Sequence, residues 1–173
     1  MVRSLKETSS GFFQKGFRMK TNIGITKADS AKVIEILSNY LADSYYLYIK
    51  THNFHWNVTG MHFQNLHKLF DEQYSALFES IDNIAERIRS LGEFVPATFA
   101  QLKELTCLKE TKEIPKDREM IKILLEDHET VIRNLRNWII EAGEAGDSGT
   151  SDFLTARIEE HEKIAWMLRS HFD

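Results

Sequence analysis

Proline is nearly absent from this chain of 173 residues, and its scarcity constrains the fold more than any other feature of the sequence. The two prolines, Pro96 and Pro115, lie in one stretch, so residues 1–95 and 116–173 contain nothing that removes a backbone donor from a helix. Apolar residues recur there at three- and four-residue steps, as in Ile34, Leu37 and Leu41, and no stretch sustains strand-like alternation. We therefore predict an all-α fold of long helices.

Capping and stop residues predict four long helices and one short one. The first begins between Thr26 and Asp29, which can cap free N–H groups, and runs to about residue 57. The second spans about 64–91 and stops at Gly92, and a short helix over 97–105 lies in the connection that follows. A third long helix spans 115–142, with Pro115 in its first turn, and a fourth spans 151–172 after a loop over 143–152. Four long helices with one long connection predict a four-helix bundle.

Charge is distributed unevenly along the chain. Residues 1–20 carry five basic side chains and one acid, a net charge of +4, whereas the remainder carries −8. We predict a basic arm at 1–20 and a bundle domain at 21–173. The arm lacks the apolar stretch of a secretory signal. It is either an unstructured segment ahead of a true start at Met19, a transit peptide, or an arm that binds DNA phosphates without sequence preference.

The single cysteine, Cys107, excludes an intrachain disulfide and suits a reducing compartment. We expect it to be a small buried side chain. The longest apolar runs are too short to span a bilayer, so no membrane partner is expected. These features predict a cytoplasmic protein.

Histidines cluster between residues 52 and 67, and a line of polar residues follows them on the second helix. The cluster contains four of the seven histidines: His52, His55, His62 and His67. At 100° per residue, His67, Asp71, Asp82 and Glu86 share one flank of the helix, beside its apolar stripe. Phe78 lies on the same flank, which is therefore not a plain solvated face. The alternative is that these are two unrelated polar pairs on a wet surface.

One helix cannot close a metal site with both pairs. His67 and Asp82 are separated by about 22 Å along the axis, whereas ligands lie about 2 Å from a metal. Two copies packed antiparallel about a two-fold axis would bring His67 and Asp71 of one chain beside Asp82 and Glu86 of the other. His55, at the end of the first helix, can reach His67. Histidine nitrogen with carboxylate oxygen suits iron, manganese or zinc.

The other histidines are assigned no ligand role. We expect His52 and His62 to lie on the surface or behind the metal ligands without binding the metal themselves. We expect the same of His128, His161 and His171. No histidine has a glutamate three residues before it, which excludes the usual intrachain di-iron motif. The His-Glu-x-x-His motif of metalloproteases is absent too.

These residues resemble the Dps family, ferritin-like proteins named for DNA protection in starved cells. The segment "HNFHWNVTG", the later "AERIRSLG" and the pattern His-x11-His-x3-Asp-x10-Asp-x3-Glu carry the resemblance, which covers about residues 22–172. The pattern is met by His55, His67, Asp71, Asp82 and Glu86. The resemblance implies a ferritin-like bundle assembled into a hollow homo-dodecamer, with ferroxidase sites at two-fold interfaces.

The resemblance also implies an activity. Fe2+ would be oxidised, preferentially by hydrogen peroxide, and iron stored as ferric mineral inside the shell. His55 and His67 would supply neutral nitrogen ligands and Asp71 a carboxylate, with Asp82 and Glu86 coming from the partner chain. Trp56 would intercept stray oxidising equivalents or pack the dimer interface.

Iron entry and DNA binding are further implications of the resemblance. Asp147 and Asp152 would line acidic three-fold channels, with Asp152 alternatively only a helix N-terminal acid. Arms at residues 1–20 would hold DNA multivalently. Competing hypotheses are a nucleoid-binding structural protein with little iron chemistry, a structural zinc site, and a surface-adhesion role.

Overall fold

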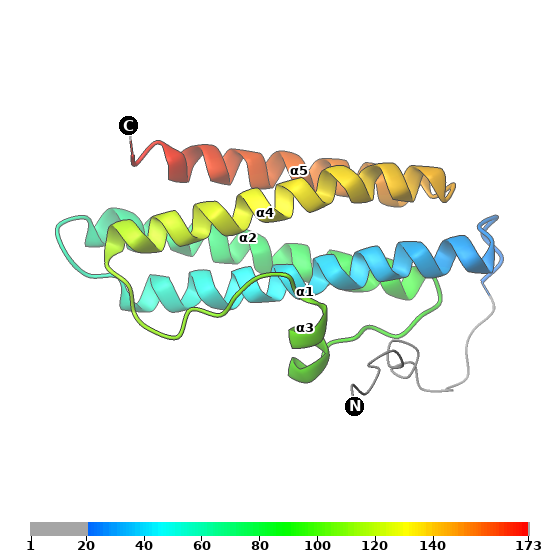
Figure 1. Ribbon diagram of the computed structural model, residues 1–173, viewed down its shortest axis with the longest axis horizontal. Coiled ribbons are helices and arrows are strands. Elements are labelled where there is room, and N and C mark those ends of the chain that lie inside the picture. The colour runs from blue at the N-terminus through cyan, green and yellow to red at the C-terminus, as the bar shows by residue number, and fades with distance from the viewer. Residues whose placement is uncertain (1–20, 173) are drawn as a thin grey trace, which may run out of the picture.

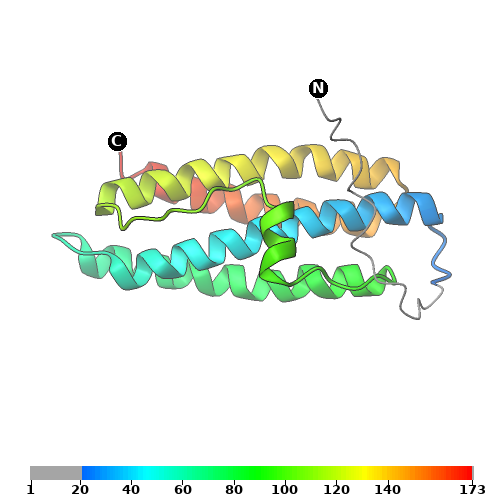
Figure 2. The ribbon, with the colours of Figure 1, turned by 60° about the horizontal axis from the view of Figure 1, so that its bottom comes forward.

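Two antiparallel helix pairs lie side by side in the computed structural model, which describes residues 21–172 (Figure 1). The elements are α1 (Lys27–Asn57), α2 (Phe63–Ser90), α3 (Phe99–Leu105), α4 (Asp117–Glu144) and α5 (Ser148–Arg169). α1 pairs with α2 and α4 with α5, and the long connection that carries α3 returns the chain so that α2 and α4 run in the same direction (Figures 1 and 2). The predicted all-α four-helix bundle with a short extra helix is confirmed. Across these residues, no helix has the length and apolar character needed to cross a membrane.

The helix starts follow local capping. The Thr26 side chain accepts a hydrogen bond from the Asp29 backbone N–H at 3.2 Å, and Thr98 forms a capping box with Gln101 at the start of α3. The prediction that Pro115 lies in the first turn of α4 was wrong by two residues. Lys116 has an extended backbone and is the N-cap, so α4 begins at Asp117.

The loop between α4 and α5 is much shorter than predicted. α4 continues through Gly143 to Glu144, and the chain turns at Gly146, whose φ of 75° lies in the left-handed region that favours glycine. α5 then starts at Ser148, capped by Asp147, and ends at Arg169. The expected loop over 143–152 was therefore wrong, because a glycine inside a packed helix weakens it without ending it.

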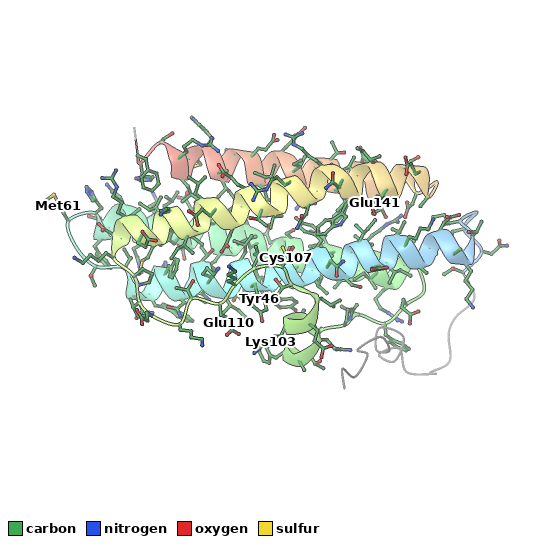
Figure 3. All side chains as sticks on the ribbon, viewed as in Figure 1. Tyr46, Met61, Lys103, Cys107, Glu110 and Glu141 are labelled. Atoms are coloured by element: carbon green, nitrogen blue, oxygen red, sulfur yellow. The ribbon has the colours of Figure 1, made fainter. Side chains whose placement is uncertain are left out.

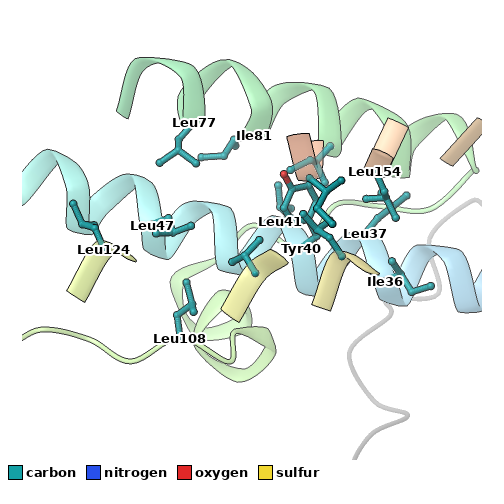
Figure 4. Close-up of a cluster of buried hydrophobic side chains, with 14 of the residues drawn as sticks. Ile36, Leu37, Tyr40, Leu41, Leu47, Leu77, Ile81, Leu108, Leu124 and Leu154 are labelled. Atoms are coloured by element: carbon teal, nitrogen blue, oxygen red, sulfur yellow. The ribbon is translucent and has the colours of Figure 1, made fainter. Parts of the chain in front are cut away.

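The bundle core is drawn from all four long helices. Tyr40 of α1 and Leu154 of α5 are at most 1% exposed, and Leu77 and Ile81 of α2 point toward α1 (Figure 4). Leu108, in the segment after α3, packs against the same cluster. Each such side chain stabilises the fold by about 1.5–3 kcal/mol through removal of apolar surface from water.

Asp43 of α1 anchors the segment that follows α3. Its buried carboxylate accepts hydrogen bonds from the Thr106 hydroxyl at 2.7 Å and the Cys107 backbone N–H at 3.0 Å. Cys107 itself is exposed, so the expectation of a buried cysteine was wrong. Desolvation and the adjacent Asp43 carboxylate raise the pKa of Cys107 to about 11.

A cavity of about 390 Å³ lies between α1, α3 and the segment after α3. Tyr46, Lys103 and Glu110 mark its surroundings in Figure 3, where Met61 projects from the turn between α1 and α2. The cavity is separate from the histidine cluster, which lies at the α1–α2 turn.

Candidate metal centre

His55 and His67 face each other where α1 ends and α2 begins. Their rings stack with centroids 3.8 Å apart and an interplanar angle of 19°. His55 Nδ1 lies 2.7 Å from the backbone oxygen of His67, and His67 Nδ1 lies 2.8 Å from the backbone oxygen of His55. The His55 carbonyl is available because the last carbonyls of a helix have no intrahelical partner.

These two hydrogen bonds determine which nitrogen of each ring carries the proton. A carbonyl oxygen can only accept, so both Nδ1 atoms donate. In each neutral ring the lone pair therefore lies on Nε2, which is the atom left to bind a metal. A histidine ligand ordinarily donates its other N–H to a carbonyl or carboxylate in this way, which holds the ring in the ligating tautomer.

Asp71 lies one turn after His67 and is held by Tyr74. The Tyr74 hydroxyl donates to Asp71 Oδ1 at 2.5 Å, and this bond to the carboxylate raises the pKa of Tyr74. The Tyr74 ring stacks on His52 with centroids 4.1 Å apart and meets His55 edge-on at 5.2 Å. The carboxylate is thus oriented from one side, and Tyr74 remains protonated to do so.

Asp82 and Glu86 lie further along the same helix, away from the histidines. Both are exposed, and within residues 21–172 neither forms a hydrogen bond or an ion pair. Because α2 is continuous from Phe63 to Ser90, His67 and Asp82 are held about 22 Å apart along its axis. No group of three histidine, cysteine, aspartate or glutamate residues able to hold a metal forms within residues 21–172 of one chain. A centre built on His55 and His67 would therefore need ligands from outside residues 21–172 of the same chain.

Aromatic side chains lie on the surface around the candidate ligands. Three of them are well exposed: Trp56 (65%), Phe63 (45%) and Phe78 (62%). Phe63 stacks on His67 at 5.1 Å, and Tyr48 contacts Phe78 at 5.8 Å. Exposed aromatic side chains are enriched on surfaces that become buried on association.

Asp147 and Asp152 occupy different environments. The Asp147 carboxylate is 3% exposed, accepts from the Thr150 N–H at 2.9 Å and binds the Arg87 guanidinium at 2.6 Å. Burial alone would raise the pKa of Asp147, but the bonds from Thr150 and Arg87 hold it below its usual value. Asp147 thus caps α5 and ties it to α2. Asp152 is exposed in the first turns of α5.

The default assignment of His128 and His161 to the surface was wrong, because both lie in the core. Their Nδ1 atoms are 2.8 Å apart, and His161 Nε2 lies 3.1 Å from the Tyr40 hydroxyl. Burial lowers the pKa of His161 to about 4 and that of His128 well below its ordinary value. Each follows a buried apolar residue at a helical step, His128 four residues after Leu124 on α4 and His161 three residues after Ile158 on α5, and this spacing was the available signal.

Comparison with known proteins identifies the class. A family model described as ferritin-like domain matches residues 34–173. A low temperature-induced protein of Nostoc sp. is 46% identical over 156 residues, covering 89% of this chain and 87% of the relative. DNA protection during starvation protein 2 of Bacillus anthracis is 37% identical over 139 residues, covering 80% and 95%.

Solved structures identify the family within this class. The crystal structure of a Dps protein from Vibrio cholerae O1, a member of a broad superfamily of ferritin-like diiron-carboxylate proteins, matches with a TM-score of 0.85 and 32% identity. The match covers 91% of this chain and all of that one. The Dps protein of Bacillus brevis matches with a TM-score of 0.82 and 34% identity over 90% of this chain and all of that one. The chain belongs to the Dps family of ferritin-like proteins.

Proposed function

We propose that this protein is a ferroxidase that oxidises Fe2+ with hydrogen peroxide at sites shared between two chains and stores the ferric product in a homo-dodecameric cage. The observation that carries the proposal is the tautomer of His55 and His67. Both rings have committed Nδ1–H to a backbone carbonyl, so both offer Nε2 to a metal. A pair of buried structural histidines would have no need to leave the same nitrogen free on each ring.

The remaining ligands come from the second chain. Asp82 and Glu86 are exposed carboxylates one turn apart, and oxygen ligands together with imidazole suit iron. A two-fold axis near residues 76–77 brings them to the His55–His67 pair of the partner and creates two equivalent sites. The exposed aromatic residues near the two half-sites, Trp56 and Phe78 among them, are the surface that this dimer buries.

Ferrous iron is the substrate, and the reaction balances without a further reductant. Two Fe2+ ions each lose one electron, the O–O bond of one peroxide breaks, and two protons complete two water molecules. Pairing the electrons at one site avoids release of hydroxyl radical. This chain's residues hold the metal ions, and Tyr74 keeps Asp71 oriented toward them.

Protection of DNA follows from removing iron and peroxide together. The relatives named for DNA protection support this part of the proposal. DNA binding through residues 1–20 is proposed separately, since that arm lies outside the described residues. Asp152 is the exposed candidate for an acidic iron-entry channel. Asp147 would contribute there only if its bond to Arg87 opened. The protein is proposed to act in the cytoplasm.

Subunit mixing tests whether the site is shared. One variant carries His55→Ala and His67→Ala, and the other carries Asp82→Ala and Glu86→Ala. Each alone should lose fast Fe2+ oxidation in a stopped-flow experiment with peroxide. Random pairing makes half of the dimers mixed, and each mixed dimer restores one of its two sites, so about one quarter of wild-type activity should return.

Control experiments distinguish a wrong ligand assignment from a failure of the two variants to assemble together. Glu35→Ala with Glu159→Ala removes two exposed carboxylates elsewhere and should leave oxidation unchanged. Mass spectrometry must show that mixed assemblies form. Full activity in the Asp82→Ala, Glu86→Ala variant would refute the carboxylate assignment. Mixed assemblies without recovered activity would refute sharing between chains and favour the structural or zinc-binding alternatives.

A further inference from the structure

A second pocket, of about 300 Å³, opens between α2 and α5 on the far side of the bundle from the α3 cavity. The two helices are each packed closely on their own partner, α2 on α1 and α5 on α4 (Figure 1). Leu69 and Leu77 of α2 and Ile164 and Met167 of α5 line its walls. Ligand pockets have volumes from about 300 Å³ upwards, so this one is large enough for a compact organic molecule.

Three of the buried residues that line this pocket are polar. Gln73, Ser80 and His161 are each at most 4% exposed. Within residues 21–172, neither the amide nitrogen nor the amide oxygen of Gln73 has a hydrogen-bond partner. The Ser80 hydroxyl likewise has no hydrogen-bond partner among these residues. A buried carboxamide without partners is costly, and buried polar groups are otherwise almost always satisfied.

The charges around the pocket select against an anion. His161 already uses both ring nitrogens, one facing Tyr40 and the other His128, and burial keeps it neutral. The exposed rim carries Glu72, Glu160 and Lys163, a net charge of −1. Among the described residues that line the pocket, the one positive side chain, Lys163, lies on the exposed rim.

We propose that this pocket binds a small neutral molecule that carries a primary carboxamide on an apolar body. A carboxamide offers a donor and an acceptor side by side, which matches Gln73 in two antiparallel hydrogen bonds. The terminal torsion of a glutamine is broad, so its amide can turn toward the pocket at little cost. The apolar body lies against Leu77, Ile164 and Met167. The proposal does not depend on the metal centre.

Equilibrium dialysis of the assembled full-length protein tests this with hexanamide as the probe. Wild type should bind one hexanamide per chain saturably. N,N-dimethylhexanamide, which has no donor, and hexanoate, which is charged, should each bind at least tenfold more weakly. Gln73→Leu keeps the side-chain volume close to constant and should weaken hexanamide binding at least tenfold. Gln64→Leu, an exposed glutamine on the same helix, should leave it unchanged.

Three results would overturn the proposal. The first is no saturable binding of hexanamide up to its solubility limit, which would mean that water alone satisfies Gln73. The second is equal binding of the three probes, which would make the contact merely apolar. The third is wild-type affinity in both Gln73→Leu and Ser80→Ala, which would mean that neither polar side chain takes part in recognition. Circular dichroism of each variant establishes that it is folded.

Discussion

Acidification should destabilise the bundle through the histidine pair in its core, and the pKa of His161 gives the magnitude of the loss in stability. In the folded protein the pKa of His161 is about 4, against about 6.5 for an unperturbed histidine. Between these values the unfolded chain binds a proton that the folded chain does not. Stability is therefore complete above pH 6.5 and decreases as pH falls, with no further loss from this group below pH 4.

Each pH unit in that window changes the free energy of unfolding by about 1.4 kcal/mol, so His161 alone should cost about 2 kcal/mol between pH 6.5 and 5. His128 acts in the same direction, because burial lowers its pKa as well. The groups around His161 oppose its protonation or are neutral: Arg157 on α5 is positive, and Tyr40 on α1 remains a phenol.

Urea denaturation at pH 6.5 and pH 5, at fixed protomer concentration, measures the loss. His161→Gln should reduce the pH dependence by about 2 kcal/mol even if it lowers stability at both pH values. His171→Gln, which removes an exposed histidine, is the matched control and should behave as wild type. An unchanged pH dependence in His161→Gln would refute the assignment of the acid lability to this side chain.

Three further outcomes are expected. Tyr74→Phe removes the bond to Asp71 Oδ1 and should weaken anaerobic Fe2+ binding several-fold by titration, whereas wild-type binding would show that Asp71 needs no such support. Asp147→Ala removes the α5 cap and leaves Arg87 without its partner, so the free energy of unfolding measured in urea should fall by about 2–3 kcal/mol. A fall of less than about 0.5 kcal/mol would contradict the role of Asp147 as a cap and as an ion-pair partner. Phe78→Asp places a charge on the exposed aromatic surface and should shift the assembly toward smaller species in sedimentation velocity, and an unaltered profile would argue that this surface is not an interface.

The helices were predictable because the regular geometry of an α-helix determines which residues of the sequence share a face. The spacing along residues 64–91 correctly predicted that His67 and Asp71 share one flank of α2. It also predicted that Asp82 lies too far along the helix to join them in one metal site of the same chain. The Dps family assignment rests on the same spacing and is confirmed by the comparisons. The sharing of the site between chains stays a proposal.

What could not be predicted depends on contacts between distant segments. Gly143 and Gly146 are both glycines in the same stretch of sequence, yet α4 continues through Gly143 to Glu144 and the chain turns at Gly146, ahead of the Asp147 cap of α5. His128 and His161 are polar in any residue-by-residue scale, yet each finds a partner across the bundle that makes its burial tolerable.

The reciprocal bonds of His55 and His67 have an evolutionary consequence. Their acceptors are main-chain oxygens, which every residue type provides, so no substitution elsewhere can delete them without moving α1 relative to α2. The tautomer of each neutral imidazole is therefore set by the geometry of the α1–α2 hairpin and not by the residue types at neighbouring positions. Substitutions at those positions can therefore change packing, charge and partner choice while the Nε2 atoms of His55 and His67 remain available to a metal.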